Sequence, residues 1–223
     1  MSSEAVLQDI GACVCASIGA PDHIRFCEEC HRYWRGDKQL LSVSKVLRST
    51  WPFKPDYSAA RPEVIENARD RGCVVDSLFT SYVKGRLQAI PRGTREDAVE
   101  LFFRLKRWWD ARNVESVQSQ VILADDDVAG MCDLIADDWI YDLKTTHDIE
   151  PMYQLQLGAY AQLHFATFQR PAKGLGIIHL TKRFSVPKLI KIDMVSALQD
   201  WAALRECYQM AVRRTNGTTT KSR

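Results

Sequence analysis

The alternation of apolar and polar residues in the middle of the chain constrains the fold more than any other feature. Three runs have the two-residue period of strands, 117–123, 128–136 and 139–144, and acidic turns at 125–127 and 137–138 separate them. A two-residue turn between such runs joins antiparallel neighbours. The sequence therefore predicts a three-stranded antiparallel unit at the centre of the fold.

Helical periodicity brackets this unit on both sides. Apolar residues recur at three- and four-residue spacing before it, and again after it, where two further strands lie between the helices. The expected helices are 63–84, 94–112, 152–169 and 196–214, and the expected strands are 174–180 and 189–192. We therefore predict an α/β (α+β) fold with a central mixed β-sheet flanked by helices.

Composition excludes several classes of protein. The chain has 223 residues, of which 46% are hydrophobic and 26% charged, as in a globular domain with a real core. A net charge of +2 is too small for a protein that coats nucleic acid, so any such binding needs a local basic patch. No run is apolar enough to span a membrane, and no secretory leader is evident at 1–20. We expect a cytoplasmic protein without a membrane partner.

The strands 128–136 and 139–144 bring two carboxylates together. Asp133 and Asp142 lie at roughly equal distances from the 137–138 turn, so they should face each other across the strand pair. Like charges at that distance repel, and a cation between them removes the cost. Hard carboxylate oxygens suit Mg²⁺ or Mn²⁺.

Lys144 completes this constellation. It lies two residues beyond Asp142, and alternate residues of a strand share a face, so its ammonium group points at the same site. The Leu143 carbonyl could add another hard oxygen ligand. A metal held by carboxylates beside a lysine can polarise a phosphate and activate a water, which is the chemistry of phosphodiester hydrolysis.

The order of these residues resembles a known signature. Gly-x-x-Asp ending at Asp133, a short gap, and Asp-x-Lys at Asp142 and Lys144 resemble the active site of the PD-(D/E)XK nuclease superfamily. Gln156 and Tyr160 on the next helix resemble the Gln-x-x-x-Tyr motif of its RecB-like exonuclease branch, where it helps to hold substrate and active-site groups. The resemblance implies a magnesium- or manganese-dependent deoxyribonuclease.

Two earlier segments extend the resemblance. The segment 41–47, with Ser42 and Ser44, is similar to the Ser-Val-Thr-x-x-Leu segment of phage-type and mitochondrial genome maintenance exonucleases. The segment 71–76 is similar to their Arg-Gly-x-x-x-His, with Asp76 where the branch usually has His or Glu. The resemblance makes Asp76 a candidate metal ligand, and Ser42 and Ser44 possible contacts to substrate.

A second departure concerns the strand before Gly-x-x-Asp. Many members of the branch have Glu there, whereas this chain has the neutral Gln120. We expect either a single tightly held metal or a role for Gln120 in positioning phosphate or water.

Structural explanations compete for each of these residues. Asp133 and Asp142 could be surface carboxylates at strand ends, although the flanking apolar runs and Lys144 argue against it. The remaining candidates have ordinary alternatives too: a helix-packing pair at Gln156 and Tyr160, a solvated helix residue at Asp76, and a plain strand residue at Gln120.

The cysteines form two closely spaced pairs. Cys13-x-Cys15 and Cys27-x-x-Cys30, with His31 adjacent, could bind zinc or an iron–sulfur cluster. However, Cys27 and Cys30 fall on a predicted hairpin strand rather than on a knuckle turn. In cluster-bearing RecB-like nucleases several cysteines follow the core, where this chain has one. We therefore expect ordinary reduced thiols and no zinc or iron–sulfur cluster.

The expected helix 94–112 carries basic and aromatic residues. Arg104, Arg107 and Trp108 could line a path for DNA if the helical segment arches over the site. An amphipathic helix with a solvated basic face and a tryptophan in the core is the more ordinary interpretation.

We predict a single nuclease domain over 1–223. Its expected parts are an N-terminal arm (1–22), a hairpin and short helix (23–50), a helical arch-like segment (56–112), a catalytic core (115–214) and a disordered tail (215–223). The resemblance implies an exonuclease acting on DNA ends, single-stranded or duplex, in phage-type replication, recombination or repair. An endonuclease of the same superfamily, or a non-catalytic nucleic-acid-binding module, are the alternatives.

Overall fold

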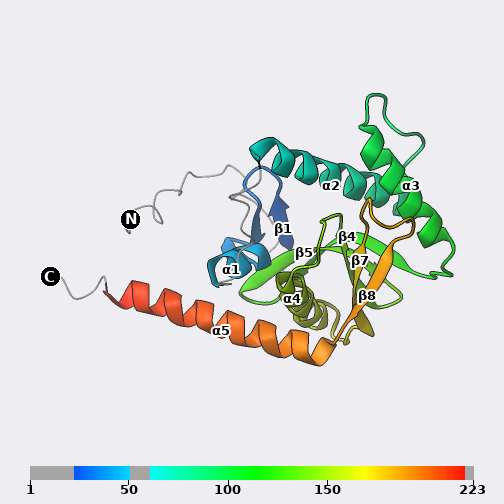
Figure 1. Cartoon of the computed structure of the whole chain (residues 1–223). Helices are drawn as coiled ribbons and strands as arrows, with labels where there is room; N and C mark the ends of the chain where they lie inside the picture. The colour runs from blue at the N-terminus through cyan, green and yellow to red at the C-terminus, as the bar shows by residue number, and fades with distance from the viewer. Residues whose placement is uncertain (1–22, 51–60, 219–223) are drawn as a thin grey trace.

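The computed structural model describes residues 23–50 and 61–218 (Figure 1). The N-terminal arm expected over 1–22, including Cys13 and Cys15, lies outside the described residues. In the described part of the chain, no helix is long and apolar enough to cross a membrane.

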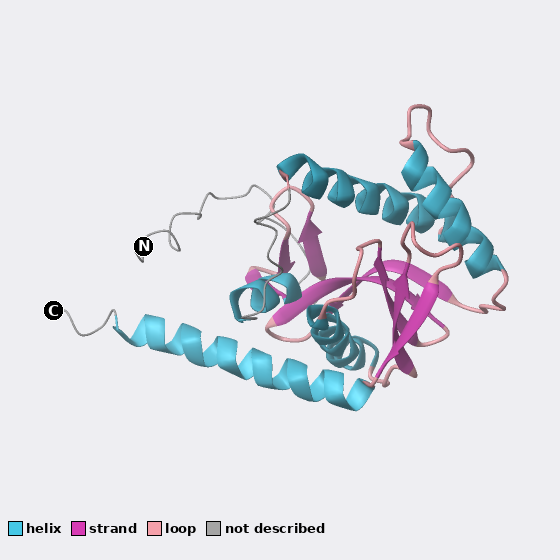
Figure 2. Cartoon of the chain, viewed as in Figure 1, coloured by secondary structure: helices cyan, strands magenta, loops and turns pink. Residues whose placement is uncertain are grey.

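One mixed sheet of eight strands forms the centre of the molecule (Figure 2). Its path runs β1-β2-β3-β5-β6-β7-β8, and β4 pairs with β5 off that path. The pairs β3·β5 and β6·β7 are parallel, and the others are antiparallel. The strands are β1 (Ile24–Cys27), β2 (Arg32–Arg35), β3 (Lys38–Ser42), β4 (Val117–Ala124), β5 (Val128–Ala136), β6 (Trp139–Lys144), β7 (Gly174–His179) and β8 (Lys188–Ile192).

Helices cover both faces of the sheet and close two cores. On one face α1, α4 and α5 bury a cluster that includes Val46, Leu157 and Trp201. On the other face α2 and α3 bury Phe79 and Phe102 against the sheet. The helices are α1 (Val43–Thr50), α2 (Pro62–Val83), α3 (Glu96–Asp110), α4 (Pro151–Phe168) and α5 (Met194–Thr218). This layered arrangement confirms the predicted mixed sheet flanked by helices.

Two predictions, one near each end of the described chain, need correction. The hairpin expected within 23–50 is a three-stranded meander, because the chain turns both at 28–31 and between β2 and β3. Cys30, expected on a strand, lies in the first of these turns. The tail expected to be disordered from 215 is helical as far as Thr218, where α5 ends. The Ser42 hydroxyl accepts the Lys45 backbone N–H at 3.1 Å and caps α1.

Strand β5 is the element around which the sheet is organised. One edge of β5 pairs with β4 from Ala129 to Ala136. Both β3 and β6 therefore pair with the opposite edge. That edge pairs with β3 at residues 128–129 and with β6 at residues 134–136. The edge between these two contacts, at residues 130–133, is where β3 and β6 separate.

The turn at Asp137 and Asp138 has the conformation that a two-residue hairpin turn requires. Both residues have left-handed backbones, with φ of 49° and 67°. Aspartate tolerates this region better than most side chains, and the mirror-image turn matches the twist of the flanking strands. The turn thereby fixes the register of β5 against β6, which decides which side chains meet at their far ends.

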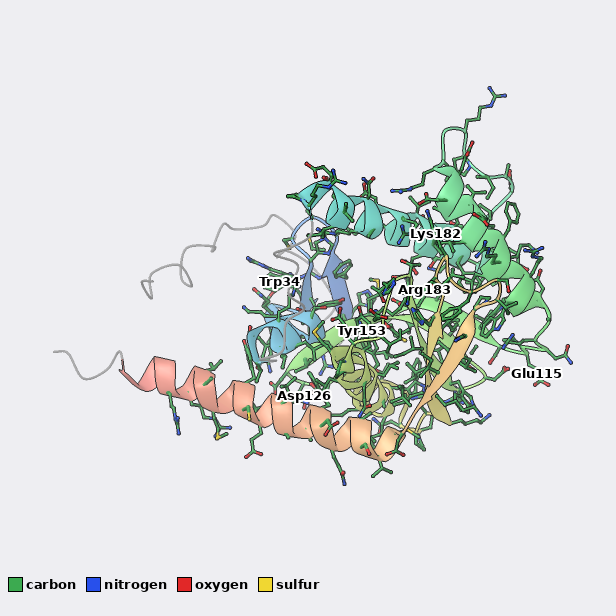
Figure 3. The ribbon with its side chains drawn as sticks, in the orientation of Figure 1. Trp34, Glu115, Asp126, Tyr153, Lys182 and Arg183 are labelled. Carbon is green, nitrogen blue, oxygen red and sulfur yellow. The ribbon has the colours of Figure 1, made fainter. Side chains whose placement is uncertain are left out.

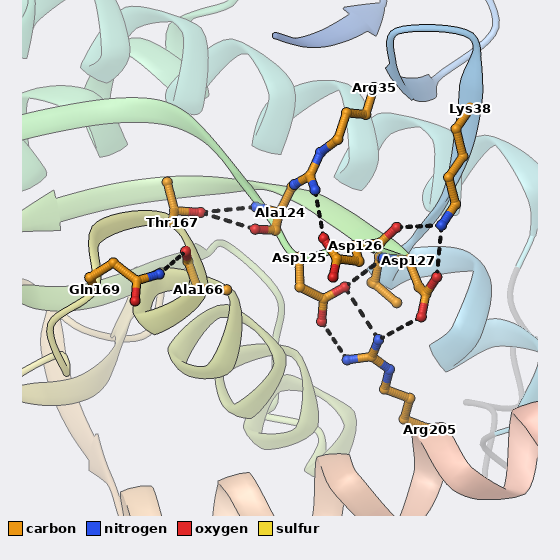
Figure 4. A network of polar contacts seen from close by, with 11 residues as sticks. Arg35, Lys38, Ala124, Asp125, Asp126, Asp127, Ala166, Thr167, Gln169 and Arg205 are labelled. Atoms are coloured by element: carbon orange, nitrogen blue, oxygen red, sulfur yellow. Dashed lines mark hydrogen bonds and ion pairs between the residues drawn. The ribbon is translucent and has the colours of Figure 1, made fainter. Parts of the chain in front are cut away.

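The acidic turn 125–127 forms ion pairs with elements that lie far away in the sequence (Figure 4). Arg205 of α5 forms a bidentate pair with Asp125, and both side chains are more than four-fifths buried. Arg35 and Lys38 of the meander bind Asp126 and Asp127. One short turn therefore ties α5 and the meander to the start of β5.

We expect Arg205→Ala to lower the free energy of unfolding by about 1–3 kcal/mol, because it leaves the largely buried Asp125 carboxylate without its cation. Urea titration followed by circular dichroism measures the loss. The control is Arg213→Ala, an exposed arginine on the same helix, which should change stability by less than about 0.5 kcal/mol. Equal effects of the two variants would contradict the fastening role.

Asp97 at the start of α3 holds a second charged junction. Its carboxylate pairs with Arg95 of the same turn, with Arg71 of α2 and with Lys182 of the β7–β8 connection, which is labelled in Figure 3. The hydrogen bond from Arg95, together with Lys182, lowers the pKa of Asp97 to about 2 against the opposing effect of burial.

Because this pKa is lowered on folding, the stability that it contributes is present above pH 4 and is lost as pH falls toward about 2. We expect Asp97→Asn to cost about 1–2 kcal/mol at pH 7, discounted for a side chain that is 24% exposed. The difference from wild type should shrink between pH 4 and pH 3 in thermal unfolding. Glu96→Gln, an exposed neighbour in the same helical turn, serves as control, and a pH-independent difference would refute the assignment.

Candidate active site

The hairpin of β5 and β6 brings Asp133 and Asp142 together. The ladder of β5 and β6 ends where Leu134 pairs with Tyr141, and Asp133 and Asp142 are the next residue of each strand. Asp133 Oδ2 accepts the backbone N–H of Leu143 at 3.0 Å, which anchors this carboxylate to the neighbouring strand. The predicted antiparallel pairing of β5 and β6 is confirmed for residues 134–136 with 139–141, and Asp133 lies on the β5 edge where β3 and β6 separate.

Asp142 is the most unusual residue of this group. It is fully buried, with 0% of its surface exposed, yet neither carboxylate oxygen has a hydrogen bond of good geometry among the described residues. Lys144 Nζ lies 2.6 Å from Oδ2 as an ion pair. A buried charge is costly unless it is paired and hydrogen-bonded, so this carboxylate is only half satisfied by the chain itself.

Lys144 connects the carboxylates to α4. Besides Asp142, its Nζ lies 3.5 Å from Gln156 Oε1 and 4.6 Å from the centre of the Tyr153 ring. Burial lowers the pKa of Lys144, but the charges of Asp142 and Asp133 more than reverse this, and the pKa is raised. The two carboxylates therefore favour the ammonium form of this side chain.

Gln156 and Tyr160 face the same site from α4. Gln156 Nε2 donates to the Tyr160 hydroxyl at 3.1 Å, and Tyr160 is 3% exposed. A Cβ at Gly130 would lie 2.8 Å from the Tyr160 ring, so the glycine of the Gly-x-x-Asp segment makes room for this tyrosine. Lys144, Gln156 and Tyr160 thus form one chain of polar contacts.

Helix α2 supplies a further carboxylate. Gln120 Nε2 donates to Asp76 Oδ2 at 3.0 Å, and Gln120 adopts a left-handed backbone with φ of 53° where the β4–β5 ladder skips one pair. Gly72, one turn earlier on α2, approaches Thr145 so closely that a Cβ there would lie 2.9 Å from Thr145 Oγ1. The helix therefore sits directly over the end of β6.

The carboxylates strongly influence one another. Burial raises the pKa of Asp133 well above its usual range, and the charge of Asp142 raises it further. Burial, followed by the charge of Asp142, also raises the pKa of Asp76. Asp133 and Asp76 are thus destabilised as carboxylates by burial and by the charge of Asp142, and a cation bound between the carboxylates would relieve this repulsion.

These observations fit a hard divalent metal ion. Asp142 offers two buried carboxylate oxygens, of which Oδ2 is paired with Lys144, and Asp133 lies close by on β5; hard carboxylate oxygens are the donors that magnesium and manganese prefer. Within the described residues, no three acidic, histidine or cysteine side chains already converge as a metal cage.

Tyr153 was not predicted from the sequence, although it belongs to this group. It is 8% exposed and presents its ring to Lys144 (labelled in Figure 3). The spacing to Gln156 is three residues, which puts both side chains on one helical face. That spacing could have identified it once Gln156 was taken as a site residue.

The other predicted substrate contacts do not join the carboxylates. Ser42 caps α1, and Ser44 is exposed, with its carbonyl accepting Arg48 Nε. Arg104 binds the Phe184 carbonyl and Glu100, while the guanidinium of Arg112 stacks 3.1 Å over the Trp108 ring. Trp109, rather than Trp108, is the tryptophan that α3 buries. Contacts of Ser42, Ser44, Arg104, Arg107 and Trp108 with a substrate remain predictions.

The architecture and this group of residues define an α/β protein with an acidic, lysine-containing site at the divergence of two sheet strands. No protein-family model matches the sequence, and no curated protein matches it. Solved structures do resemble the fold. A candidate exonuclease from Eubacterium rectale superposes with a TM-score of 0.55 at 16% sequence identity, covering 80% of this chain and 82% of that one.

Two further solved structures show a weaker likeness. An alkaline exonuclease from Laribacter hongkongensis has a TM-score of 0.40 at 11% identity, covering 82% of this chain and 94% of that one. A protein named SSO0001 has a TM-score of 0.32 at 15% identity, with 75% and 83% covered. The chain therefore shares its fold with the Eubacterium rectale protein.

Proposed function

We propose that this protein is a metal-dependent DNA nuclease of the PD-(D/E)XK type, which hydrolyses phosphodiester bonds. The observation that carries the proposal is Asp142, a fully buried carboxylate with no hydrogen bond of good geometry, opposite Asp133 and paired with Lys144. A buried carboxylate that is only partly satisfied costs stability, and a bound cation would offset that cost. The fold likeness to a candidate exonuclease supports the same class.

Asp133 and Asp142 would hold Mg²⁺ or Mn²⁺, with the Leu143 carbonyl and Asp76 as further candidate ligands. The bound metal supplies Lewis-acid stabilisation of charge on the phosphate and lowers the pKa of a water. Asp76 also accepts a hydrogen bond from Gln120, which holds its carboxylate toward the site. Gln120 thereby acts as a positioning residue and not as a ligand.

Lys144 provides a fixed positive charge at the point where the phosphate would gain negative charge. Lys144 would orient or deprotonate the attacking water, and as an ammonium ion it would donate hydrogen bonds to a phosphate oxygen. Gln156 accepts from Lys144 and donates to Tyr160, and this chain of contacts keeps the ammonium group in place. Tyr153 packs against the same group from the first turn of α4.

We favour an exonuclease acting on DNA ends, in phage-type replication, recombination or repair. The test uses linear single-stranded and duplex DNA with labelled ends beside circular DNA of the same sequence, with Mg²⁺, with Mn²⁺ and with chelator. We expect metal-dependent loss of the linear substrates and intact circles. Cleavage of the circles would identify an endonuclease, and intact DNA under every condition would identify a binding module without catalysis.

The binding module is a real second candidate because of one contact. Gln120 occupies an oxygen of Asp76 with a hydrogen bond, so this carboxylate is partly satisfied without metal. Gln120→Glu separates the two proposals. In a nuclease we expect the added carboxylate to alter the metal preference or the rate of cleavage, whereas in a binding module it should weaken DNA binding by repulsion and leave DNA uncut.

A further inference from the structure

A pocket on the other face of β6 from Asp142 is not used by the proposed nuclease chemistry. Trp139 and Tyr141 alternate with Asp142 along the strand, so their side chains point to the face of the sheet that α2 and α3 cover. Their rings line a pocket of about 370 Å³, a volume within the range of ligand-binding sites. Three further side chains that line it are Trp108, Arg112 and Lys173.

The sheet side of this pocket consists of two aromatic rings that lie over glycines. Strands β6 and β7 pair so that Trp139 lies beside Gly174 and Tyr141 beside Gly176. A Cβ at Gly174 would lie 2.5–2.6 Å from three atoms of the Trp139 ring, so this ring covers the glycine with its face. The planes of the two rings are within 14° of each other, with centres 6.1 Å apart. The other face of the Trp139 ring is therefore turned away from β7.

The helix side of the pocket is a tryptophan and an arginine that hold each other. The Arg112 guanidinium stacks 3.1 Å over the centre of the Trp108 ring, and its Nη1 donates to the Trp108 carbonyl at 2.6 Å. These contacts keep a planar cation against a planar indole just after the end of α3. The pocket thus presents flat groups from the sheet and from the helix.

Positive charge prevails around the pocket. Within the described residues no carboxylate pairs with Arg112, while Lys173 and Arg170 share the carboxylate of Asp138. The carboxylate of Asp137, which lines the pocket, accepts two backbone N–H groups. Two further charged residues nearby are Lys191, whose ammonium lies 5.4 Å from the centre of the Trp139 ring, and the exposed Glu115 (Figure 3). Cations therefore outnumber carboxylates here.

From this geometry we propose that the pocket binds an unpaired base of single-stranded DNA. Every base has a flat π-face that stacks on an aromatic ring, and cations beside the ring attract the phosphates on either side of the base. A base inside a duplex is already stacked on its neighbours and does not enter such a pocket. The choice of DNA rests on the proposed nuclease function, but binding itself needs neither the metal nor the carboxylates.

The pocket would anchor the strand away from the bond that is cleaved. Tyr141 and Asp142 point to opposite faces of β6, so the sheet separates a base in the pocket from the carboxylates. Such a base takes no part in the chemical step. We therefore expect loss of the pocket to weaken the affinity for single strands and to leave the cleavage rate at saturating DNA unchanged.

The first test measures binding without cleavage. A labelled single-stranded oligonucleotide is titrated with the full chain in chelator and followed by fluorescence anisotropy. We expect Trp139→Leu to raise the Kd by about tenfold or more, and to leave the Kd for a blunt duplex of the same sequence unchanged. The matched control is Phe103→Leu, which removes an aromatic ring of α3 that is 46% exposed and should bind as wild type does. An unchanged Kd in Trp139→Leu, or an equal loss with duplex, would overturn the inference.

A second measurement uses wild type, in case Trp139→Leu does not fold. A single strand that carries iodouracil in place of thymine cross-links, on irradiation, to the aromatic ring on which the base stacks. In chelator we expect cross-linked peptides that contain Trp139 or Trp108. Cross-links confined to Tyr153 or Tyr160, beside the carboxylates, would refute the pocket.

The failure of this inference can be told apart from the failure of the proposed function. Metal-dependent cleavage by a protein whose pocket forms no cross-link would reject the pocket as a binding site and leave the nuclease proposal standing. Cross-links in the pocket of a protein that cuts no DNA would support the pocket and reject the nuclease.

Discussion

Replacement of Asp142 by asparagine should reduce metal-dependent DNA cleavage by at least about a thousandfold, because several kcal/mol of transition-state charge stabilisation depend on the metal that this carboxylate holds. The substitution preserves the shape of the side chain and removes only its charge. Initial rates on end-labelled DNA at saturating Mg²⁺, with wild type and variant at equal concentration, measure the loss. Far-ultraviolet circular dichroism and thermal unfolding verify that the variant is folded.

The control for this prediction is Asp126→Asn. Asp126 is also an aspartate next to a strand and is also paired with a cation, but its side chain is 92% exposed. We expect its cleavage rate to equal that of wild type. If the Asp142→Asn variant cleaves within about tenfold of wild type, a loss of no more than about 1.4 kcal/mol, Asp142 is not the metal ligand that the proposal requires.

The second large effect concerns the packing of α4 on α5. A Cβ at Gly158 would lie 2.0 Å from the backbone oxygen of Ala197, which cannot rotate away as a side chain could. Helix propensity alone favours Gly158→Ala by up to about 1 kcal/mol. We expect the clash to dominate, with a net loss of at least about 2 kcal/mol as the helices move apart. For a chain of this length the unfolding temperature should fall by about 4–8 °C.

A matched control separates packing from propensity. Ala202→Gly changes an exposed position of α5 in the opposite chemical direction, and it should cost about 1 kcal/mol through propensity alone. Calorimetry on both variants should therefore find two destabilised proteins. A Gly158→Ala protein as stable as wild type, or more stable, would show that the two helices can separate at little cost.

Much of the fold follows from local sequence patterns. The two-residue period of β4, β5 and β6 predicts strands, and the two aspartates between β5 and β6 predict the tight turn that joins them. The helices α2, α3 and α4 begin and end within a few residues of their predicted bounds, because apolar spacing and proline at the start of α2 and α4 act locally. Errors arose where local signals were weak. The turn at 28–31 contains neither glycine nor proline, so the sequence did not reveal the hairpin of β1 and β2.

The residues of the candidate site likewise fall into those that local sequence predicts and those that only packing brings together. Asp133, Asp142 and Lys144 lie within one hairpin, and the register and alternation of a hairpin are fixed by sequence distance. Tyr153, Gln120 and Asp76 come from separate elements, and their contacts depend on how α2 and α4 pack on the sheet. The site roles of all these residues remain predictions that the variants above can test.

The sequence by itself determined the paired carboxylates and the lysine beside them, since strand period and turn length are properties of neighbouring residues. Only the tertiary structure decided that Asp142 is fully buried without a good hydrogen bond, and that His31 takes a left-handed backbone in the turn between β1 and β2. Burial depends on which helices cover a strand, and the left-handed backbone at His31 depends on how the whole meander closes. Both are set by contacts between residues far apart in the chain, which local periodicity does not encode.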